Sequence, residues 1–316
     1  MPLPLASSSA QARVADRIAP QIFEAPRALG LWHLASVDAP TVAVVWSLAF
    51  AWAARVRLPI LAPLLLGLGT WCVYVADRLL DALAGLREPM KNSLRERHYF
   101  HWRHRRALLP LAIGAGAAAG ILLCLTPPVT RAADAMLGAA ALIYFFAIHA
   151  GRNARQMRRG RPRLWPGKEF LVGVLFAAGC VMPAWLGDRT TATMRWAFGV
   201  SAGNFAALAW LNCRCIAQWE LAEERIPPTR FGTHESKAAI FPACVALACG
   251  GLVLAVIGAR ADWRTGALLG AGSASALLLA LLDRRRSRMT ALALRAAADL
   301  ALLTPLPLLM VAWALR

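Results

Sequence analysis

The chain has 316 residues, 59% of them hydrophobic, and a mean hydropathy of +0.51, which is too apolar for an ordinary soluble domain. Lys and Arg outnumber Asp and Glu by 35 to 17, which gives a net charge of +18. The basic residues gather in alternate segments between long apolar runs instead of forming one stripe. We therefore expect them to set membrane topology and attract anionic lipid, and we expect no nucleic-acid partner.

The first 37 residues are predicted to form an N-terminal tail or a helix on the membrane surface. Residues 13–32 mix apolar and charged side chains, which favours an interfacial helix, but a loosely ordered tail fits equally well. The apolar stretch 3–10 is short and has no basic flank before it, so we expect no cleavable signal peptide.

Residues 38–316 are predicted to form one membrane domain. They contain nine apolar stretches, each near the ~20 residues that cross a hydrocarbon core of ~30 Å. The predicted fold is therefore an all-α integral membrane protein, a bundle of nine transmembrane helices, and we expect these helices to be uninterrupted at mid-membrane. The predicted spans are 39–55, 58–80, 107–126, 132–150, 169–187, 193–213, 238–258, 264–282 and 292–315.

The distribution of basic residues predicts the orientation. Lys and Arg concentrate in the N-terminal segment and after the second, fourth, sixth and eighth spans. Cytoplasmic loops carry such an excess, so the N-terminus is predicted to be cytoplasmic. The expected location is the bacterial cytoplasmic (inner) membrane.

Two aspartates at the end of the second span are the strongest functional signal. The segment reads Tyr74-Val-Ala-Asp77-Arg78-Leu-Leu-Asp81, which places both carboxylates on one face of a helix, one turn apart. Ionisable groups at such a place are costly and are functional candidates, and two oxygen ligands at this spacing suit Mg²⁺ bound to a diphosphate. The competing interpretation is that the aspartates pair with arginines and simply end the helix.

A second acidic cluster follows the sixth span, on the same predicted side. Glu220 and Glu224 repeat the four-residue spacing, and Asn212 shares the face of Glu220 if the helix continues. Facing acidic pairs would bridge Mg²⁺ ions across one diphosphate. The alternative is a solvated acidic face.

Three further polar features lie near the predicted membrane boundary or inside a span. His98, His101 and His104 recur every third residue in a basic segment, which favours an interfacial helix that caps the site over a metal centre. Asp299 inside the ninth span is expected to pair with Arg295 or to line a cavity. Asp38 is predicted to be the N-cap of the first span.

The two acidic motifs resemble those of the UbiA superfamily of intramembrane prenyltransferases. That family has nine membrane helices, a first motif Asn-Asp-x-x-Asp-x-x-x-Asp after helix two and a second motif Asp-x-x-x-Asp after helix six. Here Asp77 and Asp81 match the last two aspartates of the first motif, while its leading Asn-Asp is Val73-Tyr74, and the second motif becomes Glu-x-x-x-Glu. The match is most specific from Asp77 to Pro89, and the substitutions indicate a divergent member.

The resemblance implies an Mg²⁺-dependent transfer of a prenyl group from a prenyl diphosphate to a lipid or aromatic acceptor on the cytoplasmic side. It implies Asp77 and Asp81 as catalytic residues, and these two with Glu220 and Glu224 as metal ligands. Arg78, Lys168 and Asn212 would bind the diphosphate, with Lys168 alternatively an interfacial anchor and Arg78 alternatively a partner in a local salt bridge.

Two other functions compete with the transferase. The substituted motifs would also fit a catalytically altered membrane scaffold or binding protein of the same descent. A transporter is the third hypothesis, because a few buried charges in a helical bundle are typical of transporters as well. The acceptor, the prenyl length, the pathway and the oligomeric state are left open by the sequence.

Overall fold

The computed structural model describes residues 23–87, 95–155, 167–187, 192–224 and 240–314. These residues form helices throughout, apart from an isolated bridge between Phe23 and Met289. The helices are α2 (Arg27–Leu34), α3 (Asp38–Ala53), α4 (Leu61–Arg87), α5 (Glu96–Arg103), α6 (Arg105–Leu125), α7 (Pro128–Arg155), α8 (Lys168–Gly187), α9 (Ala192–Glu224), α10 (Ile240–Ala261), α11 (Trp263–Arg285), the 3₁₀ turn η2 (Arg286–Arg288), α12 (Ala291–Ala301) and α13 (Pro305–Ala314).

Six of these helices are long and apolar enough to cross a membrane: α4, α6, α7, α8, α10 and α11. The number rises to eight if α2 with α3, and α12 with α13, each count as one broken span. The described residues thus confirm an all-α fold with six to eight helical segments that are long and apolar enough to cross a membrane. Nine spans and a cytoplasmic N-terminus stay predictions.

The expectation of uninterrupted spans is wrong for the ninth, 292–315, which is divided into α12 and α13. The turn between α2 and α3 agrees with the prediction, since the first span was expected at 39–55, after a separate N-terminal segment. The α2 and α3 axes differ by 87°, and the α12 and α13 axes by 44°. Ser36 adopts a left-handed backbone with φ of 59° between α2 and α3, which a helix cannot continue through. Pro305 opens α13, and proline lacks an N–H and disfavours helical geometry at the residue before it.

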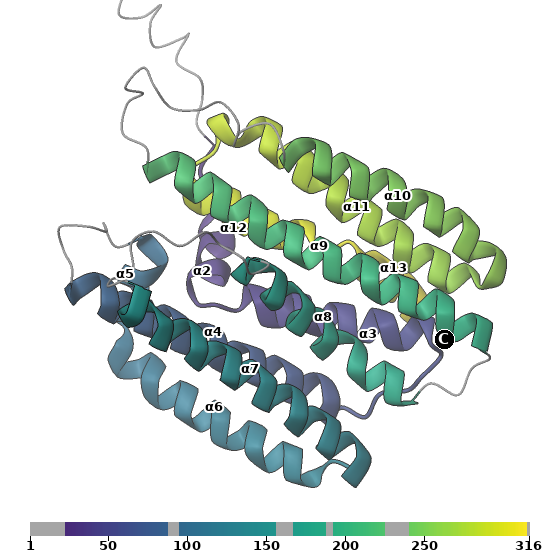
Figure 1. Cartoon of the computed structure of the whole chain (residues 1–316), viewed down its shortest axis with the longest axis horizontal. Coiled ribbons are helices and arrows are strands. Elements are labelled where there is room, and N and C mark those ends of the chain that lie inside the picture. Colours follow the sequence, from purple (N-terminus) through teal and green to yellow (C-terminus); the bar gives the residue numbers. More distant parts are fainter. Residues whose placement is uncertain (1–22, 88–94, 156–166, 188–191, 225–239, 315–316) are drawn as a thin grey trace, which may run out of the picture.

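The long helices run side by side along the longest axis of the molecule (Figure 1). One group holds α4, α6 and α7, a second holds α9, α10 and α11, and α3 and α8 lie between them. The short helices α2 and α5 lie at one end of the bundle. Helices α8 and α9 approach closely, because a Cβ atom on Gly173 would lie only 2.6 Å from the backbone nitrogen of Trp210.

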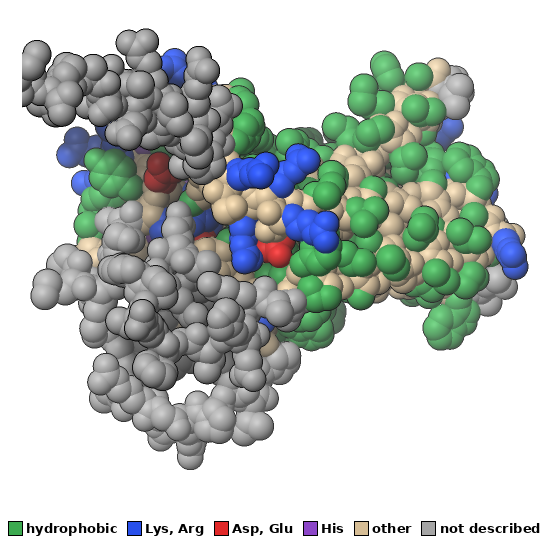
Figure 2. All heavy atoms as spheres, turned by 90° about the horizontal axis from the view of Figure 1, so that it is seen from above, with side chains coloured by type: hydrophobic (Ala, Val, Ile, Leu, Met, Phe, Trp, Pro, Cys, Tyr) green, Lys and Arg blue, Asp and Glu red, His purple; other side chains and the backbone are tan. Residues whose placement is uncertain are grey.

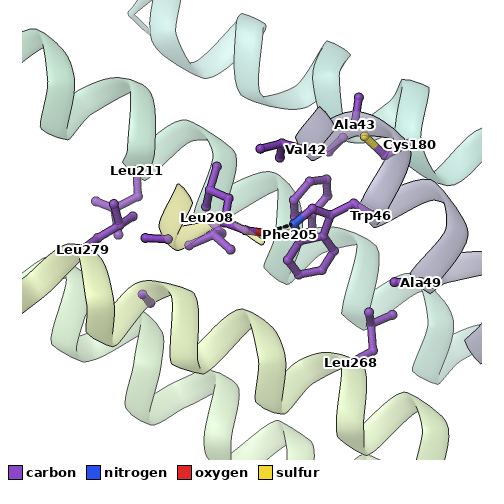
Figure 3. Close-up of a cluster of buried hydrophobic side chains, with 14 of the residues drawn as sticks. Val42, Ala43, Trp46, Ala49, Cys180, Phe205, Leu208, Leu211, Leu268 and Leu279 are labelled. Atoms are coloured by element: carbon purple, nitrogen blue, oxygen red, sulfur yellow. Dashed lines mark hydrogen bonds between the residues drawn. The ribbon is translucent and has the colours of Figure 1, made fainter. Parts of the chain in front are cut away.

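A stack of aromatic rings lies where α3 meets α9. Trp46 and Phe205 are fully buried, with ring centroids 4.0 Å apart and ring planes 21° from parallel. The Trp46 indole N–H donates to the carbonyl of Leu302, at a distance of 2.8 Å, just after α12 ends. Figure 3 shows these rings among side chains from α8 and α11. The core thus ties the break between α12 and α13 to α3.

Large apolar side chains cover much of the outer surface. Ile113 on α6, Ile143 on α7 and Val253 on α10 are each more than half exposed, which a soluble protein would rarely tolerate over so wide an area. Figure 2 shows charged side chains mainly over one half of the visible face and hydrophobic ones over the other. This distribution fits helices in contact with lipid.

Candidate functional site

The two predicted aspartates project from α4 near the charged end of the bundle. Both side chains are half-buried. Asp77 is near enough to act electrostatically on the Tyr144 hydroxyl of α7, as is Glu169 of α8. Asp81 has a carboxylate oxygen 3.7 Å from Nε2 of His98 on α5.

His98 contacts Asp81 as a neutral imidazole at pH 7. Burial and the adjacent Arg97 guanidinium lower the pKa of His98 to about 3, against the opposing effect of Asp81. Arg97 also donates to Nε2 of this ring, at a distance of 3.3 Å. The contact between Asp81 and His98 is therefore no ion pair, and it leaves the charge of Asp81 uncompensated by the histidine.

Arg78, the basic residue between the two aspartates, is buried and points elsewhere. Its Nη1 donates to the carbonyl of His33, at 2.7 Å, and its Nη2 lies 3.6 Å from Oδ2 of Asp38. The guanidinium thus holds the turn between α2 and α3, close to a second group of arginines described next.

Glu220 on α9 is buried among three arginines. Arg95 donates to its Oε2, and Oε1 lies 2.9 Å from Nη2 of Arg97 and 3.1 Å from Nε of Arg295. Burial lowers the pKa of Arg97 to about 10, while Glu220 favours its charged form and the guanidinium groups of Arg78, Arg295 and Arg95 oppose it. The predicted pair of Arg295 with Asp299 is wrong, because Arg295 pairs with Glu220 instead. We call Arg78, Arg95, Arg97 and Arg295 the arginine cluster.

Asn212 lies deeper on α9, beside a cavity. Its Nδ2 donates to Oδ1 of Asp299 on α12, at 3.1 Å. Both residues line the cavity with Tyr74 of α4 and Phe176 of α8, and about 30 Å³ is open there to the centre of a water-sized sphere. That space holds about two water molecules. Of the alternatives for Asp299, lining a cavity is the one observed.

A buried cluster that the sequence did not indicate joins α2, α3 and α12. His33, Asp38 and Asp299 each offer a nitrogen or oxygen atom within 4.8 Å of the others. Asp38 is not the predicted N-cap, because Val37 occupies that position and Asp38 begins the helix itself. The sequence indicated Asp38 and Asp299 separately, one at the start of a span and one inside another, but nothing in it placed them beside His33.

The remaining predicted site residues are Lys168 and Glu224. Lys168 opens α8 and Glu224 ends α9, and their side chains lie outside the described part of the structure. Their roles stay predictions. Of the other predicted residues, the structure brings Asn212 to the cavity and Glu220 to the arginine cluster, and Asp77 and Asp81 lie on a neighbouring face of α4.

The histidine-rich segment forms α5, and the helix expected there is confirmed. His101 is fully buried, with Nδ1 2.8 Å from the carbonyl of Arg97 and Nε2 3.0 Å from Oγ of Ser36. Nδ1 must carry the proton to bond a carbonyl, so Nε2 accepts from the serine hydroxyl. This bond anchors α5 to the turn between α2 and α3.

Stability is expected to fall as the pH is lowered from about 6.5 to about 4. Burial, assisted by the charge of Arg78, lowers the pKa of His101 to about 4, against the opposing bond to Arg97. Below about pH 6.5, the ordinary pKa of histidine, His101 is protonated in the unfolded chain but stays neutral in the folded chain, so the free energy of unfolding decreases. The lowered pKa of His98 also decreases the stability as the pH falls. Thermal unfolding in detergent at several pH values measures the effect.

The variant His101→Gln should reduce the slope of the free energy of unfolding against pH, because up to about one proton fewer is taken up on unfolding. The double variant His98→Gln with His101→Gln should reduce this slope further. The exposed His104 provides the control substitution His104→Gln. An unchanged pH profile in the double variant would contradict the assignment.

Comparison with models of protein families finds no match, and neither do comparisons with curated proteins and with solved structures. The function must therefore be argued from the site itself.

Proposed function

We propose that the protein is an intramembrane prenyltransferase that moves a prenyl group from a prenyl diphosphate to a hydrophobic acceptor with the help of Mg²⁺. The observation that carries this proposal is the arginine cluster, which lies near the Asp77 and Asp81 carboxylates at one end of an apolar helical bundle. A molecule with a diphosphate head and a hydrocarbon tail matches that distribution of charge and apolar surface.

Asp77 and Asp81 fit a metal that bridges to a diphosphate. Mg²⁺ usually takes one or two protein carboxylates and completes its shell with phosphate oxygens and water, and two half-buried carboxylates one turn apart offer that. When bound, the ion would neutralise charge on the diphosphate. Glu220 fits a metal less well, because its oxygens already contact three guanidinium groups. We propose that it positions the arginines.

The arginine cluster would bind the diphosphate itself. Three of its guanidinium groups contact Glu220, and that of Arg78 lies 3.6 Å from Asp38, so four positive groups gather around two carboxylates in a largely buried place. Guanidinium groups bind phosphate oxygens strongly. Fixed charges in a dry site also stabilise the negative charge that develops when the C–O bond to the diphosphate breaks. The bonding pair leaves with the diphosphate, and the prenyl carbon bonds to an acceptor atom that gives up a proton.

Aromatic side chains would shield the allylic cation. Tyr74 lines the cavity one turn before Arg78, and Phe176 lines it from α8. The face of an aromatic ring attracts a cation. The apolar tail and the acceptor would lie in the membrane, between the helices.

Binding of farnesyl and geranylgeranyl diphosphates to the purified protein in nanodiscs tests the proposal. We expect Mg²⁺-dependent binding that Asp77→Ala and Asp81→Ala weaken at least about tenfold, since each removes a ligand charge. Asp134→Ala on α7 is the control, because that half-buried aspartate lies outside the site. No binding by the folded wild-type protein would refute the proposal for these donors.

A transporter is favoured by one observation, the two bent helix pairs, because transporters often bind substrates where helices are broken. Uptake of a labelled prenyl diphosphate into proteoliposomes, without transfer of its prenyl group to any acceptor, would support it. Binding without turnover would instead support the scaffold hypothesis.

A further inference from the structure

The buried cluster of His33, Asp38 and Asp299 lies at the two breaks in the helices. His33 is in the last turn of α2, Asp38 begins α3, and Asp299 is in the last turn of α12. Only 2% of the His33 side chain and 1% of the Asp38 side chain are exposed, against 16% for Asp299. Three ionisable side chains thus converge in a place to which water has little access.

Their polar atoms converge at contact distance. Nδ1 of His33 lies 2.5 Å from Oδ2 of Asp38 and 3.4 Å from Oδ2 of Asp299, while Nε2 of the same ring is buried without a hydrogen-bond partner. Buried polar atoms without partners are costly and rare. One ring nitrogen and two carboxylate oxygens that converge on one point form a donor set that a divalent ion could share, with a small separation of Nδ1 and Oδ2 on binding.

A fourth oxygen is available beside them. Oδ1 of Asn212 is buried and without a hydrogen-bond partner, while Nδ2 of the same amide donates to Asp299. Asn212 and Asp299 also line the cavity, which gives an ion a route and room for water ligands. Both carboxylates also have neighbours that would orient them, as the ligands of metal sites usually do. Arg78 lies 3.6 Å from Asp38, and Asn212 donates a hydrogen bond to Asp299.

We propose that His33, Asp38 and Asp299 bind a divalent first-row transition-metal ion, with Asn212 as a further oxygen ligand. The donors would be Nδ1 of a neutral imidazole and Oδ2 of each carboxylate. Two carboxylates balance the charge of a divalent ion, and the imidazole nitrogen favours ions from Mn²⁺ to Zn²⁺ over Mg²⁺ and Ca²⁺, which prefer oxygen. The four ligands are distinct from the Asp77 and Asp81 pair, while Arg78 and the cavity serve both proposals. Variants of Asp77 and Asp81 therefore distinguish the failure of one proposal from the failure of the other.

Such an ion would fasten three helices whose ends are broken at this place. It joins α2 to α3 across the turn at Ser36, and it joins both to α12 just before the bend at Pro305. Metal ligation would hold the ring nitrogen and the two carboxylates to one centre, and we expect it to stabilise this end of the bundle.

Mn²⁺ binding to the full-length protein, stripped with a chelator and held in detergent, tests the proposal. Mn²⁺ is chosen because it prefers nitrogen and oxygen ligands over the thiols of Cys215 and Cys244, which lie 3.9 Å apart. With no diphosphate present to complete an ion's shell at Asp77 and Asp81, we expect one ion per chain by elemental analysis, and pulsed electron paramagnetic resonance should show coupling to an imidazole nitrogen. Zn²⁺ should displace Mn²⁺, as expected from the order of affinities.

The variants separate this site from the rest of the protein. His33→Gln and Asp299→Asn should each weaken Mn²⁺ binding at least about 100-fold, because loss of a residue that only orients a metal ligand already costs about 10–100-fold. His33→Gln should also abolish the coupling to nitrogen. Asp77→Asn with Asp81→Asn should leave Mn²⁺ binding unchanged, even where it abolishes diphosphate binding.

The proposal fails if folded wild-type protein binds neither Mn²⁺ nor Zn²⁺ stoichiometrically, or if bound Mn²⁺ shows no imidazole coupling. It also fails if His33→Gln binds as tightly as the wild type. Each of these results would mean that a proton, shared among the histidine and the carboxylates, occupies the cluster. The wild-type measurements decide the matter even where a variant does not fold.

Discussion

Glu220→Gln is expected to lower the free energy of unfolding by about 3–5 kcal/mol, because removal of one partner leaves buried charges uncompensated. The carboxylate contacts Arg95 beside α5, Arg97 on α5 and Arg295 on α12. Without it, three guanidinium groups remain together in a largely buried place. Equilibrium unfolding in mixed micelles, followed by circular dichroism, measures the loss.

Glu96→Gln is the matched control, since Glu96 is exposed on α5 and exposed ion pairs contribute about 0–1 kcal/mol. The double variant Glu220→Gln with Arg97→Gln should recover part of the loss, because one of the uncompensated charges is gone. A stability of Glu220→Gln within about 0.5 kcal/mol of the wild type, the range of ordinary surface substitutions, would contradict the described arrangement.

Trp46→Ala is expected to cost about 3–5 kcal/mol, the range for large aromatic side chains removed from a core. The indole stacks on Phe205 and donates to the carbonyl of Leu302. Alanine would leave a cavity and a buried carbonyl without its donor. The loss should be seen as a lower unfolding midpoint by circular dichroism, which does not depend on tryptophan fluorescence.

Trp46→Phe separates the contribution of packing from that of the hydrogen bond, because it keeps most of the aromatic packing and removes the N–H donor. The loss of that donor should lower the free energy of unfolding by about 1–3 kcal/mol. Trp196→Ala is the control, since 78% of Trp196 is exposed. Equal destabilisation by Trp46→Ala and Trp196→Ala would mean that the aromatic stack does not hold α3 against α9.

The helices could be predicted from the sequence because apolar length is a local property. The stretches predicted at 107–126 and 169–187 correspond closely to α6 and α8. The helix at His98 to His104 was likewise indicated by its own residues. The division near Ser36 was also indicated, since the first span was predicted to begin at residue 39. The break before Pro305 was missed, because residues 302–304 interrupt a long apolar run there without lowering its average hydropathy much.

The partners of the charged residues were decided by tertiary structure alone. Arg295 was expected to pair with Asp299, one turn away on the same helix, but it contacts Glu220 on α9. Asn212 reaches Asp299 across 87 residues of chain. Spacing along one helix predicts which side chains share a face. It does not predict what faces them from another helix, because that depends on how the helices pack.

The sequence by itself thus determined an apolar, all-helical chain with two aspartates one turn apart and an acidic residue at the end of a long helix. Only the packing of α2, α3, α9 and α12 decided that Glu220 lies among arginines and that His33 lies between Asp38 and Asp299. The physical reason is that buried charges in a low-dielectric interior must find compensating partners, and helices brought together from distant parts of the chain supply them.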